Sequence, residues 1–196
     1  MVQKADSARR GRPPTFDRDA VVASAMGAFF HKGFEATTLA ELEAATGLDR
    51  SSLYNSFGGK AGLYEAATTT YLDRAEQTLL HPLLNGTDDG YADLLAFLDN
   101  LRIGLTSADA IPGCLIVNDM AAGADPAAAA RYRALIEEGL RAALDRAGDA
   151  DAERRAAFLT ASVIGVNLVA KTTAGDAAEI ARHVAAIVDE VVSWRG

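Results

Sequence analysis

Apolar residues recur at helical spacing along nearly the whole chain of 196 residues. The first stripe consists of Val22, Met26, Phe29 and Phe30, at positions i, i+4, i+7 and i+8, and predicts a helix over about residues 18–32. Further stripes follow, and glycine, proline or a capping residue separates each from the next. No alternating pattern bounded by turn residues predicts a strand. We therefore expect an all-α chain of about nine helices, because each stripe between two breaks is long enough for one helix.

Two short helices are predicted after the first. Thr38 followed by Glu41 has the spacing of a capping box, and Gly47 ends the helix that this box opens. Asp49 is a second N-cap, and the helix that it opens ends at the glycine pair 58–59. Two short helices joined by a tight turn form a helix-turn-helix candidate.

The rest of the chain reads as a larger helical body. Its penultimate helix is apolar or small on every side over residues 158–170, and such a helix must be covered on all sides. Ala161, Gly165 and Ala170 would permit close helix approach across a two-fold interface, which predicts a homodimer. A central core helix of a monomer remains the alternative.

Charge is divided unevenly along the chain. The formal net charge is −8, but residues 1–62 carry eight basic against seven acidic side chains, so the acidic excess lies in the body. Lys4, Arg9, Arg10 and Arg12 make the first dozen residues a cationic arm that can lie along phosphates. We expect a flexible basic arm over residues 1–14, a helix-turn-helix domain over residues 15–60 and a larger helical body over residues 61–196.

Other classes of protein are disfavoured. The single cysteine forms no intrachain disulfide, no zinc-like ligand set is present, and the three histidines are scattered without a catalytic partner motif. The longest apolar run is too short to span a bilayer, and no signal-peptide core opens the chain. We expect a cytoplasmic protein without metal, cofactor, membrane contact or enzymatic activity.

The second short helix carries the chemistry expected of DNA recognition. Arg50, Ser51, Ser52 and Asn55 face away from its apolar side, and they offer a guanidinium for guanine, hydroxyls, and an amide for adenine. Thr38 and Lys60, at the ends of the two-helix unit, are placed to hold phosphates.

The segment from Gly11 to about Leu72 closely resembles the DNA-binding domain of the tetracycline-repressor (TetR) family of bacterial regulators. The resemblance rests on the joint spacing of these matching stretches: residues 11–13, 29–34, 37–39, Leu42, 45–48, 52–54, Phe57, Lys60 and 63–64. It implies a homodimeric repressor with a three-helix DNA-binding head, a linking fourth helix and an all-helical body whose last two helices form the dimer bundle.

The resemblance also implies which residues touch DNA. Positions that match the family's usual contacts are Thr38, Ser51, Ser52, Tyr54, Asn55 and Lys60, with Tyr54 on a phosphate; Arg50 is assigned from its own chemistry. One departure is Gly59, which replaces the usual Ser or Asp cap of the fourth helix and suggests a more flexible hinge.

Polar residues on apolar helices predict a ligand pocket in the body. Asn167 and Lys171 lie one turn apart, and Asn118 belongs to a segment expected to cover the body. Asn167 could instead bond across the dimer interface, and Lys171 could simply be exposed. Cys114 is expected to be a buried small hydrophobe rather than a reactive sensor. The remaining pocket candidates are aromatic or aliphatic and equally suit the core: Phe97, Leu101, Tyr132 and Phe158.

The sequence therefore predicts a DNA-binding regulator, most simply a homodimeric repressor released from a palindromic, double-stranded operator by a small-molecule effector. A transcriptional activator, or a helical ligand-binding protein that has lost DNA binding, are the alternatives.

Overall fold

The computed structural model describes residues 16–108, 110–120 and 124–195, and all regular elements in these ranges are helices. The all-α expectation is confirmed. The described ranges hold ten helices, against about nine expected, and two of the ten, α5 and α7, are short. The basic arm, including Arg12, lies outside the described residues. In chain order the helices are α1 (Arg18–Ala36), α2 (Leu39–Thr46), α3 (Arg50–Phe57), α4 (Lys60–Gln77), α5 (His81–Leu84), α6 (Gly90–Thr106), α7 (Leu115–Met120), α8 (Pro126–Arg146), α9 (Ala152–Thr172) and α10 (Ala177–Ser193).

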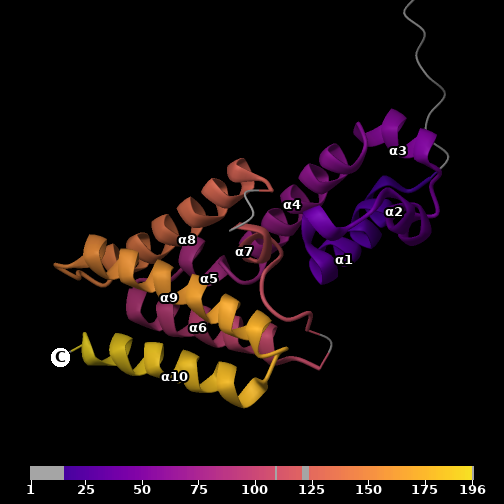
Figure 1. The fold of residues 1–196 in the computed structure, drawn as a ribbon. Coiled ribbons are helices and arrows are strands. Elements are labelled where there is room, and N and C mark those ends of the chain that lie inside the picture. Colours follow the sequence, from indigo (N-terminus) through magenta and orange to yellow (C-terminus); the bar gives the residue numbers. More distant parts are fainter. Residues whose placement is uncertain (1–15, 109, 121–123, 196) are drawn as a thin grey trace, which may run out of the picture.

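The first three helices form a small head at one end of the molecule, and α4 runs from this head into the body (Figure 1). The predicted helix starts are confirmed: the side chain of Asp17 accepts hydrogen bonds from the backbone at the start of α1, and Asp49 accepts one from Ser52 N at the start of α3. Thr38 and Glu41 form the full capping box of α2. Local capping chemistry thus fixes where the head helices begin.

The head has its own apolar core. Phe29, Leu42, Leu53 and Leu63, one from each of the first four helices, are fully buried. Residues with polar side chains are left on the outer surface of α2 and α3. The head is thus a compact support that holds α3 at the surface.

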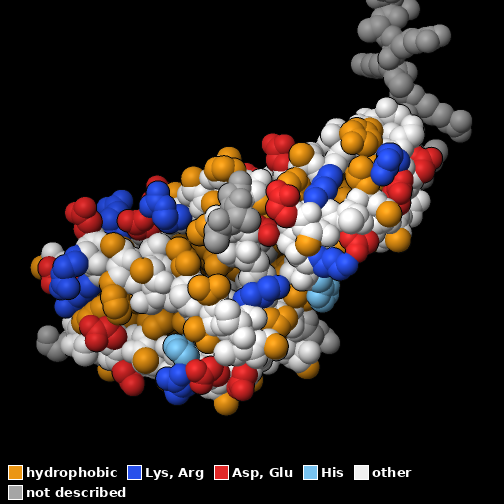
Figure 2. Space-filling view, in the orientation of Figure 1, with side chains coloured by type: hydrophobic (Ala, Val, Ile, Leu, Met, Phe, Trp, Pro, Cys, Tyr) orange, Lys and Arg blue, Asp and Glu red, His pale blue; other side chains and the backbone are white. Residues whose placement is uncertain are grey.

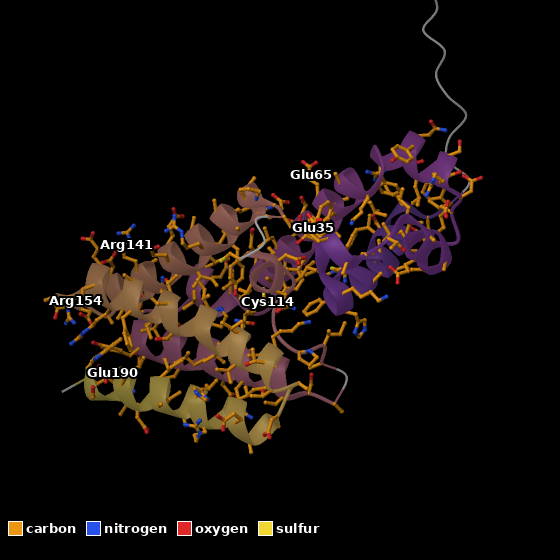
Figure 3. The ribbon with its side chains drawn as sticks, viewed as in Figure 1. Glu35, Glu65, Cys114, Arg141, Arg154 and Glu190 are labelled. Carbon is orange, nitrogen blue, oxygen red and sulfur yellow. The ribbon has the colours of Figure 1, made fainter. Side chains whose placement is uncertain are left out.

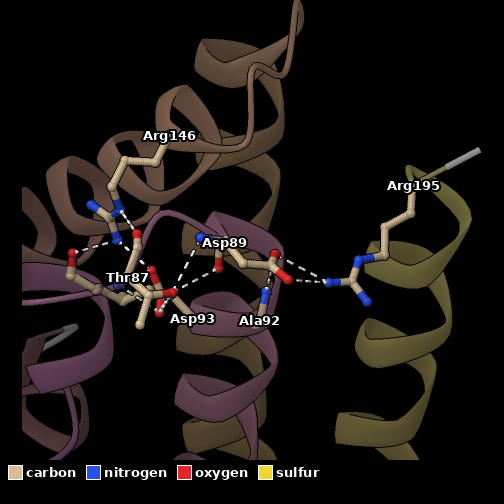
Figure 4. A network of polar contacts seen from close by, with 7 residues as sticks. Thr87, Asp89, Ala92, Asp93, Arg146 and Arg195 are labelled. Carbon is tan, nitrogen blue, oxygen red and sulfur yellow. Dashed lines mark hydrogen bonds and ion pairs between the residues drawn. The ribbon is translucent and has the colours of Figure 1, made fainter.

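The body packs α6, α8, α9 and α10 around a larger core, with α7 between this bundle and the head (Figure 1). At the end away from the head, the carboxylate of Asp93 accepts from Thr87 N at 2.9 Å and pairs with Arg146 at 2.9 Å (Figure 4). Arg146 also donates to the carbonyl oxygens of Thr87 and Leu83, so this network ties the α5–α6 turn to the end of α8. None of the described helices is both long and apolar enough to cross a membrane.

Candidate nucleic-acid interface and ligand pocket

Helix α3 divides into a buried face and an exposed polar face. Leu53 and Phe57 point into the head core, with 0% and 8% of their surface exposed. Arg50, Ser51, Tyr54 and Asn55 are exposed, and Ser52 is half-buried. The residues predicted to recognise bases therefore share the solvent side of one short helix. A recognition helix needs this arrangement to enter a major groove.

Few contacts restrain this polar face. Asn55 Nδ2 lies 3.4 Å from Ser51 Oγ, one turn away, and Asp49 caps the helix through Ser52 N at 2.7 Å. That cap lowers the pKa of Asp49 below its ordinary value, because its carboxylate accepts the hydrogen bond. The Arg50 guanidinium stands on the exposed first turn of α3.

The two residues expected on phosphates are placed differently. Thr38 is exposed at the start of α2, but its hydroxyl donates to Glu41 Oε2 at 2.9 Å within the capping box. Lys60 is half-buried, with its Nζ 3.2 Å from the carbonyl oxygen of Glu35 and 4.5 Å from the ring centroid of Phe34. A phosphate contact from Lys60 would thus require its flexible side chain to swing outward.

Gly59 starts α4 in a conformation that favours glycine. Its φ is +95° and its ψ is −158°, a backbone conformation that L side chains rarely adopt. A Cβ at this position would lie 2.8 Å from Cε1 of Tyr54. The start of α4 has no side-chain cap, as expected, and the glycine is also required by its backbone conformation and by the tyrosine ring packed on it. A more flexible hinge at this position stays a prediction.

A buried carboxylate joins the head to the body. Asp119, on α7, is 7% exposed, and its Oδ2 accepts from Phe34 N at 3.0 Å and from Tyr64 Oη at 2.8 Å. Gly33 makes room for this group, since a Cβ there would lie 2.6 Å from Asp119 Oδ1. Burial, and then the hydrogen bond to Asp119, raise the pKa of Tyr64 well above its usual range.

Sequence reasoning missed this contact between α7, α1 and α4, which we call the Asp119 clasp. The one available signal was an acidic residue in the otherwise largely apolar segment 114–120.

A pocket of about 560 Å³ opens where α1, α4, α6 and α9 approach one another. Leu101 and Asn167, both predicted pocket residues, line it, together with Phe30 of α1 and Tyr71 of α4. Asn167 is 3% exposed and its Nδ2 donates to Val163 O at 2.9 Å within its own helix, so it faces inward rather than toward a partner subunit.

The other candidates from the sequence lie elsewhere. Asn118 is adjacent, since its Oδ1 would be 2.6 Å from a Cβ on the pocket residue Gly113, and its side-chain polar atoms are buried without a partner among the described residues. Lys171 is exposed in the last turn of α9. Phe97 and Tyr132 are buried core residues that do not line this pocket. Phe158 is 48% exposed and packs against Trp194 on the outer surface, so the expectation that it lines a pocket is wrong.

Cys114 is buried, as expected. It is 1% exposed, and Figure 3 shows it inside the fold, whereas Arg141, Arg154 and Glu190 lie at the surface. Burial raises the pKa of its thiol, although a hydrogen bond with Tyr71 acts in the opposite direction. A buried, protonated thiol is a poor nucleophile.

Comparison with known proteins agrees with this geometry. Residues 21–67 match the family described as bacterial regulatory proteins, tetR family. The chain is 38% identical over 113 residues to the HTH-type transcriptional repressor ComR of Escherichia coli K12, covering 56% of this chain and 52% of that protein. It is 38% identical over 72 residues to the HTH-type transcriptional repressor BdcR of the same organism, covering 37% and 36%. The matches thus span about half of ComR and about a third of BdcR.

Solved structures extend the likeness over about nine tenths of the chain. A cysteine mutant of the TetR family transcriptional regulator CifR, complexed with 26-base-pair operator DNA, aligns with a TM-score of 0.75 and 27% identity over 93% of this chain and 98% of that one. A TetR regulator from Chloroflexus aurantiacus shares the fold, with a TM-score of 0.76 and coverage of 89% and 93%. Residues 21–67 thus match the DNA-binding segment of the TetR family, and nearly the whole chain adopts the fold of TetR-family transcriptional regulators.

Proposed function

We propose that this protein is a homodimeric transcriptional repressor that binds a palindromic operator through α3 and is released by a small-molecule effector. The observation that carries the proposal is the exposed face of α3, which presents Arg50, Ser51, Tyr54 and Asn55 from a head with its own buried apolar core. The descriptions of ComR and BdcR as repressors, and of CifR as bound to operator DNA, support it.

Arg50 and Lys60 have different roles in this proposal. A guanidinium that grips guanine specifies sequence, whereas an ammonium on a phosphate contributes affinity to all sequences. Arg50→Ala should cost about 1–3 kcal/mol per contact and relax the preference at one position of each half-site. Lys60→Ala should weaken binding to operator and random DNA alike and flatten the salt dependence.

The test is a gel-shift titration of wild type, Arg50→Ala and Lys60→Ala. The probes are DNA flanking the protein's own gene and a scrambled duplex of equal length, at two salt concentrations. If both variants lose the same affinity for the flanking DNA as for the scrambled duplex, the sequence-reading role of Arg50 is contradicted. Absence of any preference of the wild type for the flanking DNA would show that this DNA holds no operator, and the same titration is then run on duplexes selected from a random pool.

The outer face of α9 supports dimerisation. One subunit leaves Phe158, Ala161, Gly165 and Leu168 exposed, a stripe at helical spacing, with Phe158 48% and Leu168 53% accessible. Figure 2 shows hydrophobic side chains over this part of the surface, with charged side chains mostly toward its edges. An apolar stripe of this kind indicates a protein interface.

Gly165 allows a clean test of the dimer. A Cβ there would meet nothing within 4 Å inside the subunit, so Gly165→Leu should leave the fold of each subunit intact while obstructing close approach of two α9 helices. Sedimentation should show a dimer for the wild type and dissociation for Gly165→Leu. A wild type that sediments as a monomer at micromolar concentration would contradict the interface.

Release requires that effector and DNA favour different arrangements of the two heads. The recognition helices of a dimer must lie about one DNA turn apart, roughly 34–36 Å, and α4 connects each head to its body. An effector that tilts α4 changes that spacing, and a tenfold loss of DNA affinity needs about 1.4 kcal/mol of differential binding. Effector and operator must then weaken each other by the same factor.

A further inference from the structure

The C-terminal end of α3 is held by a side chain from α1. The helix itself packs mainly against α2 and α4. Arg18, the first residue of α1, lies 38 positions earlier in the chain than Ser56, and its Nη1 donates to Ser56 O at 2.9 Å. The Cζ atom of the same guanidinium lies 4.2 Å from the ring centroid of Phe57. One side chain of α1 thus contacts the last two residues of the helix that carries the exposed polar face.

The hydrogen bond to Ser56 O satisfies a carbonyl at the end of a helix. The last carbonyl groups of a helix have no partner within it. The amides of the glycine pair 58–59 bond to the carbonyl oxygens of Tyr54 and Leu53, at 2.9 and 3.4 Å, and are thus already in use. A cation at this end also interacts favourably with the negative end of the helix dipole. The guanidinium of Arg18 therefore caps α3 from outside the helix.

The ring of Phe57 is the second point of attachment. Phe57 is 8% exposed and belongs to the apolar core of the head, where its ring also packs against Phe16 at 6.3 Å between centroids. Arg18 is exposed, so its contact with this ring lies at the surface of the head. A cation over the face of an aromatic ring is attracted to it, and the planar guanidinium can stack and donate at the same time.

We propose that Arg18 is a positioning residue for sequence recognition, which fixes the tilt of α3 and so places Arg50 and Asn55 without touching a base. The proposal rests on the proposed function, because it assumes that α3 reads the operator. Groups that recognise a partner must be held within about 0.5 Å and 10–20° of their working geometry by supporting contacts. Of the eight residues of α3 only Leu53 and Phe57 are buried, so a tie at one end of this helix has a large effect on its orientation.

A direct contact with phosphate is the competing role for an exposed arginine. Such a contact contributes alike to every sequence, so its loss lowers the affinity for operator and random DNA by one factor and reduces the salt slope by about one. A lost positioning contact displaces Arg50 and Asn55, and it therefore lowers the affinity for the operator far more than the affinity for random DNA. The ratio of the two affinities separates the two roles.

The test is a titration of wild type and Arg18→Ala with an operator duplex enriched from a random pool and with a scrambled duplex of equal length, at two salt concentrations. We expect about a tenfold loss for the operator and less than about a threefold loss for the scrambled duplex. The matched control is Lys32→Met, which removes the same charge from the same helix, where Lys32 pairs with Glu41 of α2. The control should lose the same factor on both duplexes. Equal losses on both duplexes in Arg18→Ala as well would overturn the proposal.

A double-mutant cycle with Phe57→Leu tests whether Arg18 acts through α3. Leucine keeps an apolar side chain in the core of the head but removes the ring beneath the guanidinium. The combined variant should therefore lose less operator affinity than the product of the two single losses, because residues in contact are coupled. Single losses that multiply in full would contradict a positioning contact between Arg18 and Phe57.

Amide hydrogen exchange in the free protein tests the tie without DNA. Arg18→Ala should speed exchange at residues 57–59 by at least about threefold, because the end of α3 opens more often, whereas Gly47 at the end of α2 should exchange as in the wild type. Unchanged exchange at residues 57–59 would overturn the proposal. A wild type that distinguishes no duplex contradicts the proposed function instead, and the exchange rates still decide whether Arg18 holds α3.

Discussion

The Asp119 clasp should contribute measurably to the stability of the head on the body. In Asp119→Ala, Phe34 N and Tyr64 Oη each lose an acceptor in a partly or fully buried place. Hydrogen bonds to a charged group contribute about 1.5–3 kcal/mol each. Because the substitution also removes the desolvation cost of the carboxylate, we expect a net loss of about 2–3 kcal/mol.

Thermal unfolding is the assay. For a chain of this size that loss lowers the Tm by about 4–12 °C. Tyr64→Phe removes only one of the two hydrogen bonds, so it should lower the Tm by less than half as much as Asp119→Ala does. Asp99→Ala is the matched control: Asp99 pairs with Arg102 at 2.6 Å, but both are exposed, and such pairs contribute about 0–1 kcal/mol. Asp119→Ala and Asp99→Ala with the same Tm would refute the reasoning.

The clasp also makes a coupled prediction with Gly33. Gly33→Ala places a methyl group against Asp119 Oδ1 at a φ of +81°, so it should destabilise through both contact and backbone strain. In the double variant with Asp119→Ala the contact is gone and only the strain remains. The losses of unfolding free energy in the two single variants should therefore sum to about 1 kcal/mol more than the loss in the double variant. Strict additivity would show that the two residues do not meet.

Three further predictions concern the head and the far end of the body. Gly59→Asp should lower the Tm rather than stiffen the start of α4, because the backbone is strained for any side chain and the Tyr54 ring is too close; an unchanged or higher Tm would contradict this. Lys32 and then Thr38 lower the pKa of Glu41 from 4.5 to about 2. The ionised Glu41 carboxylate therefore stabilises the fold above pH 4.5, and this stabilisation is lost as the pH falls toward 2. The Tm difference between wild type and Glu41→Gln should shrink over that range, and a constant difference would contradict the assignment. Arg146→Ala should cost about 2–4 kcal/mol in urea unfolding, because it leaves the buried carboxylate of Asp93 without its cation, and a smaller cost than that of Arg102→Ala would be inconsistent with this.

Local sequence signals predicted the helices of the head well. Asp17, Thr38 and Asp49 start their helices as expected, because a cap acts on backbone groups only two or three residues away. Pro82 shows the limit of that reasoning. The helix before it, α4, ends at Gln77 as a proline break requires, but the short helix α5, with Pro82 in its first turn, was not expected.

Contacts between distant segments could not be predicted in this way. Phe34 and Asp119 are 85 positions apart, and no spacing rule connects them. Phe158 was misjudged because α9 is apolar on all sides, so periodicity does not indicate which side faces the core. The pocket combines walls from α1, α4, α6 and α9, and its location follows only from their packing.

Selection of duplexes from a random pool tests the central claim most directly. The full-length protein is used to enrich bound DNA through several rounds, and the enriched sequences are read. We expect a palindrome whose half-site centres lie about one helical turn, or a multiple of it, apart, because two α3 helices related by a two-fold axis would read it. Arg50→Ala, selected in parallel, should lose the preference at one position in each half-site. Enrichment of no sequence, or of a site without two-fold symmetry, would contradict the account of this chain as a homodimeric, operator-binding regulator.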